Sequence, residues 1–211
     1  TINYNEGLGE TFTGTNVGFS VFGSLGISGS NGSYSLQSSS SGTVVFDATH
    51  LYTGTTTLRG GSNTTLLLST LPAAGRDIVV KGGILDLNSQ TTGVMNSITI
   101  GGDTQNVAGS ATGQNASLPN GTIKANTYSF NPGYYATDTI TGVVANGSSA
   151  TGVVKTGLGR TILVANNTFS GSTTIANGYL RISKDENLGL APGTATVNNI
   201  VLAYPGTLEI S

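Results

Sequence analysis

Short runs in which apolar and polar residues alternate follow one another along most of this 211-residue chain. Gly, Asn or Ser separates successive runs, which is typical of short β-strands joined by turns. β-branched residues and Gly interrupt every helical pattern before it covers about three turns. The pattern therefore predicts an all-β chain. The expected strands lie at residues 43–46, 55–58, 65–68, 77–80, 84–87, 97–100, 161–164, 173–175, 180–182, 196–202 and 207–210.

One block of the sequence occurs twice, at residues 42–58 and 159–175, and the two copies align without a gap. Each copy has Gly at both ends of a twelve-residue step, an aromatic residue two positions before the second Gly, and Thr-Thr-aliphatic after it. An internal repeat of short β-rich units predicts a stacked, solenoid-like fold, which builds long surfaces instead of deep pockets.

A smaller signature, Gly-x-aliphatic-x-aliphatic, occurs at residues 83–87, 178–182 and 206–210, with a weaker copy at 121–125. Because side chains alternate across a strand, the two aliphatic residues of each copy share one face. We expect an inward orientation for Leu85, Leu87, Leu180, Ile182, Leu208 and Ile210, and an outward one for Asp86, Arg181 and Glu209. The same alternation in the longer repeat predicts inward rows of Val44, Phe46, Tyr52, Leu58, Leu163, Phe169, Ile175, Leu180 and Ile182.

The amino-acid composition argues against several classes of protein function. Charged residues make up 9 % of the chain, against about 25 % in typical globular proteins. With 36 % hydrophobic residues at regular places, the chain has enough apolar surface to fold. It has no Cys, so thiol and disulfide chemistry are absent, and its 8 basic residues are scattered singly, which argues against a nucleic-acid-binding patch. No apolar run approaches the roughly 20 residues of a membrane-spanning helix.

Residues 101–120 lack the strand signals found elsewhere. This stretch is rich in Gly, Ala, Ser, Asn and Gln, and Val107 and Leu118 are its only aliphatic residues larger than Ala. We expect it to be an excursion loop from a single solenoid that covers residues 1–211. The chain opens at Thr1 without Met or a signal peptide, so we expect it to be a piece of a longer protein.

The second copy of the repeat resembles the passenger-associated transport repeat of Gram-negative autotransporters. Residues 154–157 are similar to the Leu-x-Lys-x-Gly lead-in of that family, and 183–189 and 81–88 to two of its other segments. The first copy departs from the motif, since His50 replaces the Asn and Leu51 the Thr. The positions of the second copy that fit are Gly159, Leu163, Asn167, Thr168, Phe169, Gly171, Thr173, Ile175, Gly178 and Leu180.

This resemblance implies a right-handed parallel β-helix that is exported through an outer-membrane β-barrel of the parent chain. It also implies a secreted, surface-attached location on a Gram-negative bacterium. Members of the family include adhesins, autoaggregation factors, toxins and some proteases or esterases. Family membership therefore leaves the activity open.

The candidate catalytic groups are few, and we expect no catalytic, cofactor-binding or metal-binding residues and no cofactor. Asp185 and Glu186, the only adjacent acidic pair, lie in an expected turn, whereas a glycosidase needs two facing carboxyl groups. His50 is the only His, with Asp47 three residues before it. Since His50 takes the place of the motif's Asn, which is Asn167 in the second copy, we expect both to fill equivalent structural positions facing the interior or the turn backbone.

The sequence favours a non-enzymatic surface module that mediates adhesion or self-association through an outward polar face. Its expected partners are a second copy of itself, or a protein or glycan of a host surface. An alternative is a β-helix stalk that carries a toxin or enzyme located elsewhere in the parent chain. A third possibility, polysaccharide hydrolysis by the chain itself, has little support from ten scattered acidic residues.

Overall fold

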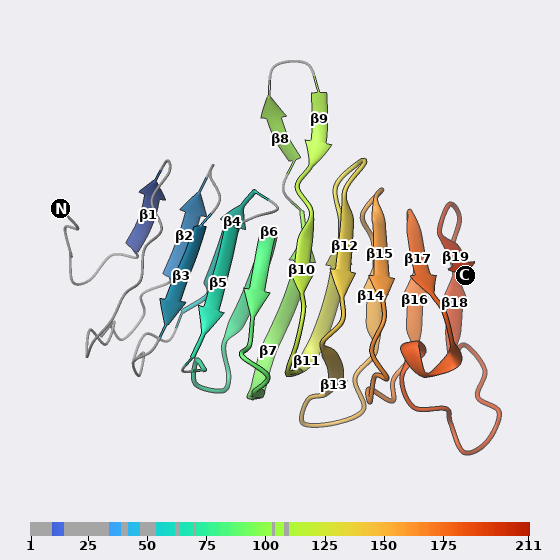
Figure 1. Ribbon diagram of the computed structural model, residues 1–211. Helices are drawn as coiled ribbons and strands as arrows, with labels where there is room; N and C mark the ends of the chain where they lie inside the picture. Colours follow the sequence, from blue (N-terminus) through green and yellow to red (C-terminus); the bar gives the residue numbers. More distant parts are fainter. Residues whose placement is uncertain are drawn as a thin grey trace.

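The computed structural model describes residues 10–14, 34–38, 42–46, 54–61, 64–69, 71–102, 104–107 and 110–211, and the structural statements below concern these ranges. Nearly all regular elements are strands, and they stack into a β-solenoid in which β1 and β19 lie at opposite ends (Figure 1). A single turn of 3-10 helix, η1 (Asp185–Leu188), is the only helical element in this part of the chain. The predicted all-β parallel solenoid is confirmed.

Two long parallel sheets form the walls of the solenoid. Sheet A contains β1 (Glu10–Gly14), β2 (Tyr34–Ser38), β4 (Thr56–Gly60), the first half of β6 (Asp77–Asp86), the second halves of β7 (Thr91–Gly101) and β11 (Thr122–Asn131), β14 (Val153–Lys155), β16 (Thr173–Ile175) and β18 (Ile200–Leu202). Sheet B contains β3 (Gly42–Phe46), β5 (Thr64–Leu68), the second half of β6, β10 (Ala116–Leu118), β12 (Thr137–Ile140), β15 (Arg160–Leu163), β17 (Tyr179–Ile182) and β19 (Thr207–Ile210). A shorter third wall is formed by the first halves of β7 and β11 together with β13 (Val143–Asn146).

Each turn of the solenoid repeats the strand order of the turn before it. Tyr34 of β2 pairs with Thr56 of β4, and Thr56 with Ile78 of β6, a step of 22 residues each time (56 − 34 and 78 − 56). Gly83 and Gly178, the first residues of two short signatures, have φ angles of 92° and 60°, which side-chain-bearing residues rarely adopt. A Cβ atom on Gly83 would lie 2.7 Å from the carbonyl oxygen of Thr64. These glycines therefore allow the chain to bend close to the preceding turn of the solenoid. We call each such turn a rung.

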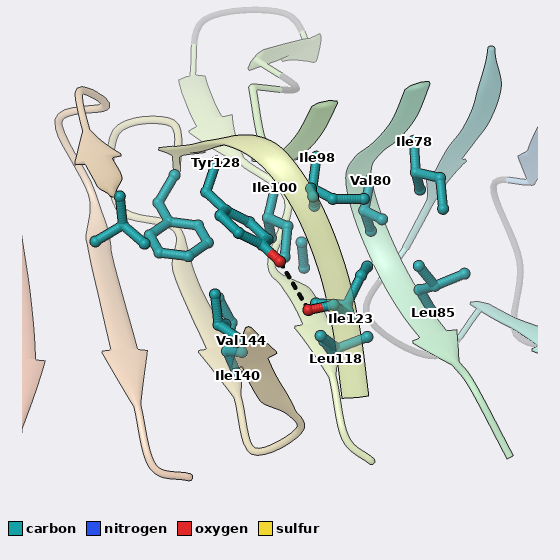
Figure 2. Packing of buried hydrophobic residues seen from close by; sticks show 14 of the residues in the cluster. Ile78, Val80, Leu85, Ile98, Ile100, Leu118, Ile123, Tyr128, Ile140 and Val144 are labelled. Carbon is teal, nitrogen blue, oxygen red and sulfur yellow. Dashed lines mark hydrogen bonds between the residues drawn. The ribbon is translucent and has the colours of Figure 1, made fainter. Parts of the chain in front are cut away.

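Inward side chains fill the solenoid in rows, one residue per rung. Ile78, Ile98 and Tyr128 are register partners on successive turns of sheet A, and all three are buried (Figure 2). The Tyr128 hydroxyl lies 2.7 Å from the carbonyl oxygens of Ile123 and Ala145, which satisfies this polar group inside the core. Burying each large aliphatic or aromatic side chain contributes about 1.5–3 kcal/mol.

The predicted inward orientation is confirmed for eight of the described side chains. The predicted residues that are buried are Leu58, Leu85, Leu87, Leu163, Phe169, Ile175, Leu180 and Ile182. Tyr52 and the side chains of Val44 and Phe46 lie outside the described part of the chain. The predicted inward orientation of Ile210 is wrong, because its side chain is 76 % exposed. Leu208 packs partly against the core. β19 pairs only with β17, so no described strand covers the far side of this last rung.

Several strand limits differ from the prediction. Residues 77–80 and 84–87 were expected as two strands, but β6 runs continuously from Asp77 to Asp86. The expected strand 196–202 begins only at Ile200, because residues 197–198 form a turn in which Asn198 has a φ angle of 61°. Four strands between residues 122 and 155 were not predicted as such, although the weaker signature at 121–125 marks the start of β11.

Within residues 101–120 the chain leaves the stack and returns to it. β8 (Thr104–Val107) and β9 (Ser110–Gly113) pair antiparallel and form a hairpin that projects away from the sheets (Figure 1). The expected excursion loop does not extend to residue 120, because residues 116–118 form β10, which pairs with β6 and β12. Ala116 and Leu118 are buried, which holds this short strand against the core.

A search of the described residues found no helix with the length and apolar character needed to cross a membrane.

Candidate binding surface and interior polar residues

The outer face of sheet A carries an uninterrupted column of small uncharged residues. Parallel register places one such residue on each of seven successive rungs, and each is partly or fully exposed to solvent. We call these residues the sheet A column. They are Thr57, Val79, Thr99, Ser129, Val154, Thr174 and Val201. Adjacent strands lie about 4.8 Å apart, so the column presents methyl and hydroxyl groups at a constant spacing.

The outer face of sheet B is different, because it carries charges and an aromatic ring. Arg160 and Glu209 form a bidentate ion pair, with Nε–Oε2 and Nη2–Oε1 distances of 2.8 and 3.0 Å. Tyr179 lies on the rung between them, and the Arg160 guanidinium carbon is 5.5 Å from the centre of its ring. The hydrogen bond between the two side chains raises the pKa of Arg160 and lowers that of Glu209. The pair is partly exposed, so its contribution to stability is small.

Two buried asparagines close one corner of the solenoid. Asn167 accepts a hydrogen bond from the Val144 N–H at 2.8 Å and donates one to the Asn187 carbonyl at 2.6 Å. Asn187 in turn donates to the carbonyls of Val164 and Ala165, both at 2.9 Å. These bonds satisfy backbone groups that leave the strand ladder at the bend. The predicted structural role of Asn167 is confirmed, whereas His50 lies outside the described residues.

A buried pair of opposite charges, Asp138 and Lys155, was missed by the sequence analysis. Asp138 accepts a hydrogen bond from the Ala116 N–H at 2.8 Å, while its other carboxyl oxygen has no hydrogen-bond partner. Burial raises the pKa of Asp138 to about 7 and lowers that of Lys155 to about 8. Lys155 Nζ donates to the carbonyls of Gly157 and Asn177. The sequence contained one clue to this burial: in the alternation Thr-Asp-Thr-Ile, Asp138 occupies an inward position.

The acidic residues considered for catalysis are not brought together into a site. Asp185 and Glu186 lie in η1, and both are exposed to solvent. Asp47 and His50 fall outside the described residues. Over the described ranges, no three side chains of His, Cys, Asp or Glu are grouped closely enough to hold a metal ion.

Comparisons with known proteins agree with the repeats seen in the fold. Residues 39–62 and 153–182 match the model of the passenger-associated-transport-repeat family. The chain is 30 % identical over 135 residues, or 62 % of its length, to the adhesin BmaC autotransporter of Brucella suis biovar 1 (strain 1330). It spans only about 3 % of the length of that relative. No solved structure matches the chain.

The second matched range contains β14 to β17, the rungs that hold Lys155, Asn167 and Gly178 in their structural positions. The motif residues thus serve the corners and core of a parallel solenoid. Passenger domains of this kind are secreted to the surface of Gram-negative bacteria and remain attached to the outer membrane. The matched repeats, the adhesin relative and the β-solenoid together support an autotransporter passenger domain with passenger-associated transport repeats.

Proposed function

We propose that this passenger module is non-enzymatic and mediates self-association or adhesion through the sheet A column. The observation that carries the proposal is the register of seven uncharged outward residues on seven successive rungs. A second copy has the same rung spacing, so the two columns can meet side by side over many rungs. Each contact is weak, but contacts repeated in register add up to a stable association.

Charge also supports this proposal. The formal net charge is −2 for 211 residues, so like molecules approach one another with little repulsion. The adhesin name of the Brucella relative belongs to that protein, and it supports an adhesive role here by analogy. The passenger context implies linkage to an outer-membrane β-barrel, which would hold many copies on one cell surface. A protein or glycan on a host surface is the alternative partner.

The non-enzymatic part of the proposal rests on the placement of the acidic groups. The adjacent pair Asp185 and Glu186 faces solvent in a turn, and the buried Asp138 has no second carboxylate beside it among its electrostatic partners, which are Ala116 and Lys155. Glycoside hydrolysis needs two carboxyl groups across the same bond. Assay of the purified chain against polysaccharides and esters is the direct check, and turnover of either would contradict this part.

The adhesive proposal is tested by placing like charges along the column. Cells displaying the passenger with Thr99→Lys, Val154→Lys and Thr174→Lys together are expected to stop clumping, because two lysine rows repel each other. Each single variant should have a small effect, since the remaining rungs still make contact. The control carries Thr139→Lys and Ile162→Lys on the outer face of sheet B, and it should clump normally.

Two measurements are needed side by side. Sedimentation of the displaying cells reports clumping, and thermal melting of the purified chain reports whether the fold survives. Clumping that persists in the folded triple variant would contradict the sheet A column as the contact surface. Equal loss of clumping in the triple variant and the sheet B control would show only a general effect of added charge, and would also contradict it.

A further inference from the structure

Exposed tyrosines gather along the corner of the solenoid where sheet A turns into sheet B. Tyr134 and Tyr135 lie between β11 and β12, Tyr179 begins β17, and Tyr204 lies between β18 and β19. Their side chains are 49 %, 73 %, 43 % and 100 % exposed. Leu158, at the same corner between β14 and β15, is also exposed. We call these five residues the corner ridge.

The register of sheet B shows that the ridge runs along the solenoid axis. Thr137, Arg160, Tyr179 and Thr207 are partners on four successive rungs. Tyr134 and Tyr204 each stand three residues before the first and last members of this column. The rungs that follow these two tyrosines are three strand spacings apart, about 14 Å. Tyr179 and Leu158 come from the rungs between them.

The tyrosines at the start of the ridge are held in a costly conformation. Tyr135 has a φ angle of 62°, in the left-handed region that bulky residues rarely adopt. The Ala136 N–H donates to the Gly133 carbonyl at 3.0 Å and closes this turn. The rings of Tyr134 and Tyr135 have centroids 3.9 Å apart, and the hydroxyl of Tyr135 raises the pKa of Tyr134 by hydrogen bonding to it. Such strain at an exposed aromatic pair is typical of a binding surface.

Polar groups lie beside the rings. Arg160 stacks over Tyr179 and pairs with Glu209, and the hydroxyls of Thr137 and Thr207 belong to the same column. Exposed rings next to fixed donors and acceptors suit a ligand with apolar faces and a polar rim. We propose that the corner ridge binds a linear glycan along the solenoid axis, with sugar rings packed on the tyrosines and sugar hydroxyls bonded to Arg160, Glu209 and the threonines.

Other classes of ligand fit this surface less well. A peptide added as a strand would lie along a free sheet edge such as β19, parallel to that one strand, and so would not follow the ridge from rung to rung. A nucleic acid needs a cluster of unpaired cations. Here Glu209 balances Arg160, which leaves a single positive charge, Arg181, on this face. A glycan needs neither feature.

This site is separate from the sheet A column, so the two proposals can fail independently. The probes are cellohexaose, chitohexaose, maltohexaose and a hyaluronan hexasaccharide, titrated by calorimetry against the purified 211-residue chain. At least one is expected to bind, and Tyr179→Ala should weaken its binding by about tenfold or more, as for an aromatic residue at the centre of an interface. Tyr179→Phe keeps the ring and should retain most of the binding.

Two further variants distinguish loss of sugar binding from loss of the folded structure. Tyr135→Gly removes a ring at a position whose φ angle suits Gly, so it should weaken binding without lowering the melting temperature. Val154→Ala, in the sheet A column, should bind the hexasaccharide as the unaltered chain does. The inference is overturned if none of the four hexasaccharides binds, or if Tyr179→Ala and Tyr135→Gly bind as tightly as the unaltered chain. Loss of clumping without loss of sugar binding would bear on the sheet A column alone.

Discussion

Asn167 and Asn187 occupy the same corner of neighbouring turns, and the Asn167 side chain donates to the Asn187 backbone carbonyl at 2.6 Å. The Asn187 side chain donates back to two carbonyls of the turn that holds Asn167. Each side chain therefore replaces backbone hydrogen bonds that the bend interrupts. The corner of the repeat motif is thus a hydrogen-bonded joint between rungs.

Replacing Asn167 by Ala should destabilise the chain. The Val144 N–H and the Asn187 carbonyl would lose their partners inside the protein, at a cost of about 1–3 kcal/mol for each buried group left unsatisfied. The free energy of unfolding, measured in urea, checks this prediction. Asn166→Ala changes the exposed neighbouring residue and serves as the control. Equal stability of the two variants would contradict the proposed joint.

Asp138 should make stability depend on pH. Its pKa of about 7 in the folded chain lies above the unfolded value of about 4, so the contribution of this group is complete below pH 4 and is lost as the pH rises through 7. Asp138→Asn keeps an oxygen that can accept from the Ala116 N–H but does not titrate. Between pH 5 and pH 8 the unaltered chain should lose about 2–4 kcal/mol more stability than Asp138→Asn.

Urea unfolding of both proteins at several pH values measures this difference. Lys155 titrates at a higher pH than Asp138. Its pKa of about 8 lies below the ordinary value for a lysine. Its contribution is complete above the unfolded pKa of about 10.4 and is lost as the pH falls through 8. Parallel stability profiles for the unaltered chain and Asp138→Asn from pH 4 to pH 8 would show that Asp138 does not titrate as described.

Gly178→Ala should be strongly unfavourable. The φ angle of Gly178 is 60°, and an added Cβ would press on the carbonyl oxygen of Gly157 and lie 2.8 Å from Lys155 Nζ. Strain of this kind costs about 1–3 kcal/mol. Gly193→Ala is the matched control, since a Cβ there meets no atom within 4 Å. Comparison of the two melting temperatures tests the prediction, and a similar shift in both would refute it.

The Arg160–Glu209 pair should contribute little to stability. Both side chains are partly exposed, so Arg160→Ala is expected to cost less than about 1 kcal/mol, and the effect should shrink further at high salt. Thermal melting at low and high salt measures it. Arg181→Ala, on the next column of the same face, provides the comparison. A large, salt-independent loss for Arg160→Ala would indicate that its stem, not its charge, supports the fold.

Much of the fold could be predicted because the relevant signals are local. Alternation within five residues decided that Leu180 and Ile182 point inward, since the pleat fixes this geometry. The twin blocks at 42–58 and 159–175 predicted stacking. The sequence missed β12 and β14 because charged residues, Asp138 and Lys155, occupy inward positions there, and it missed β13 because two adjacent residues, Val144 and Ala145, are both buried.

The candidate surfaces could not be predicted from the sequence. Val154 and Thr174 are neighbours in the sheet A column, and Tyr134 and Tyr179 lie at one corner of the solenoid. Both arrangements depend on the lengths of the intervening loops. The register between rungs depends on those loops, and each rung has a different one. The burial of Asp138 was hidden for the same reason, since it depends on the rungs stacked above and below it.

The sequence by itself therefore determined the strand type, the inward rows and the glycines of the turns, because each depends on a few neighbouring residues. Only the tertiary structure decided which outward residues stand in one column, that Asp138 and Lys155 are buried together, and that Ile210 is exposed on the last described rung. These features depend on contacts between residues that are 17 or more positions apart (155 − 138 for Asp138 and Lys155), and the register of the stacked strands brings such residues together.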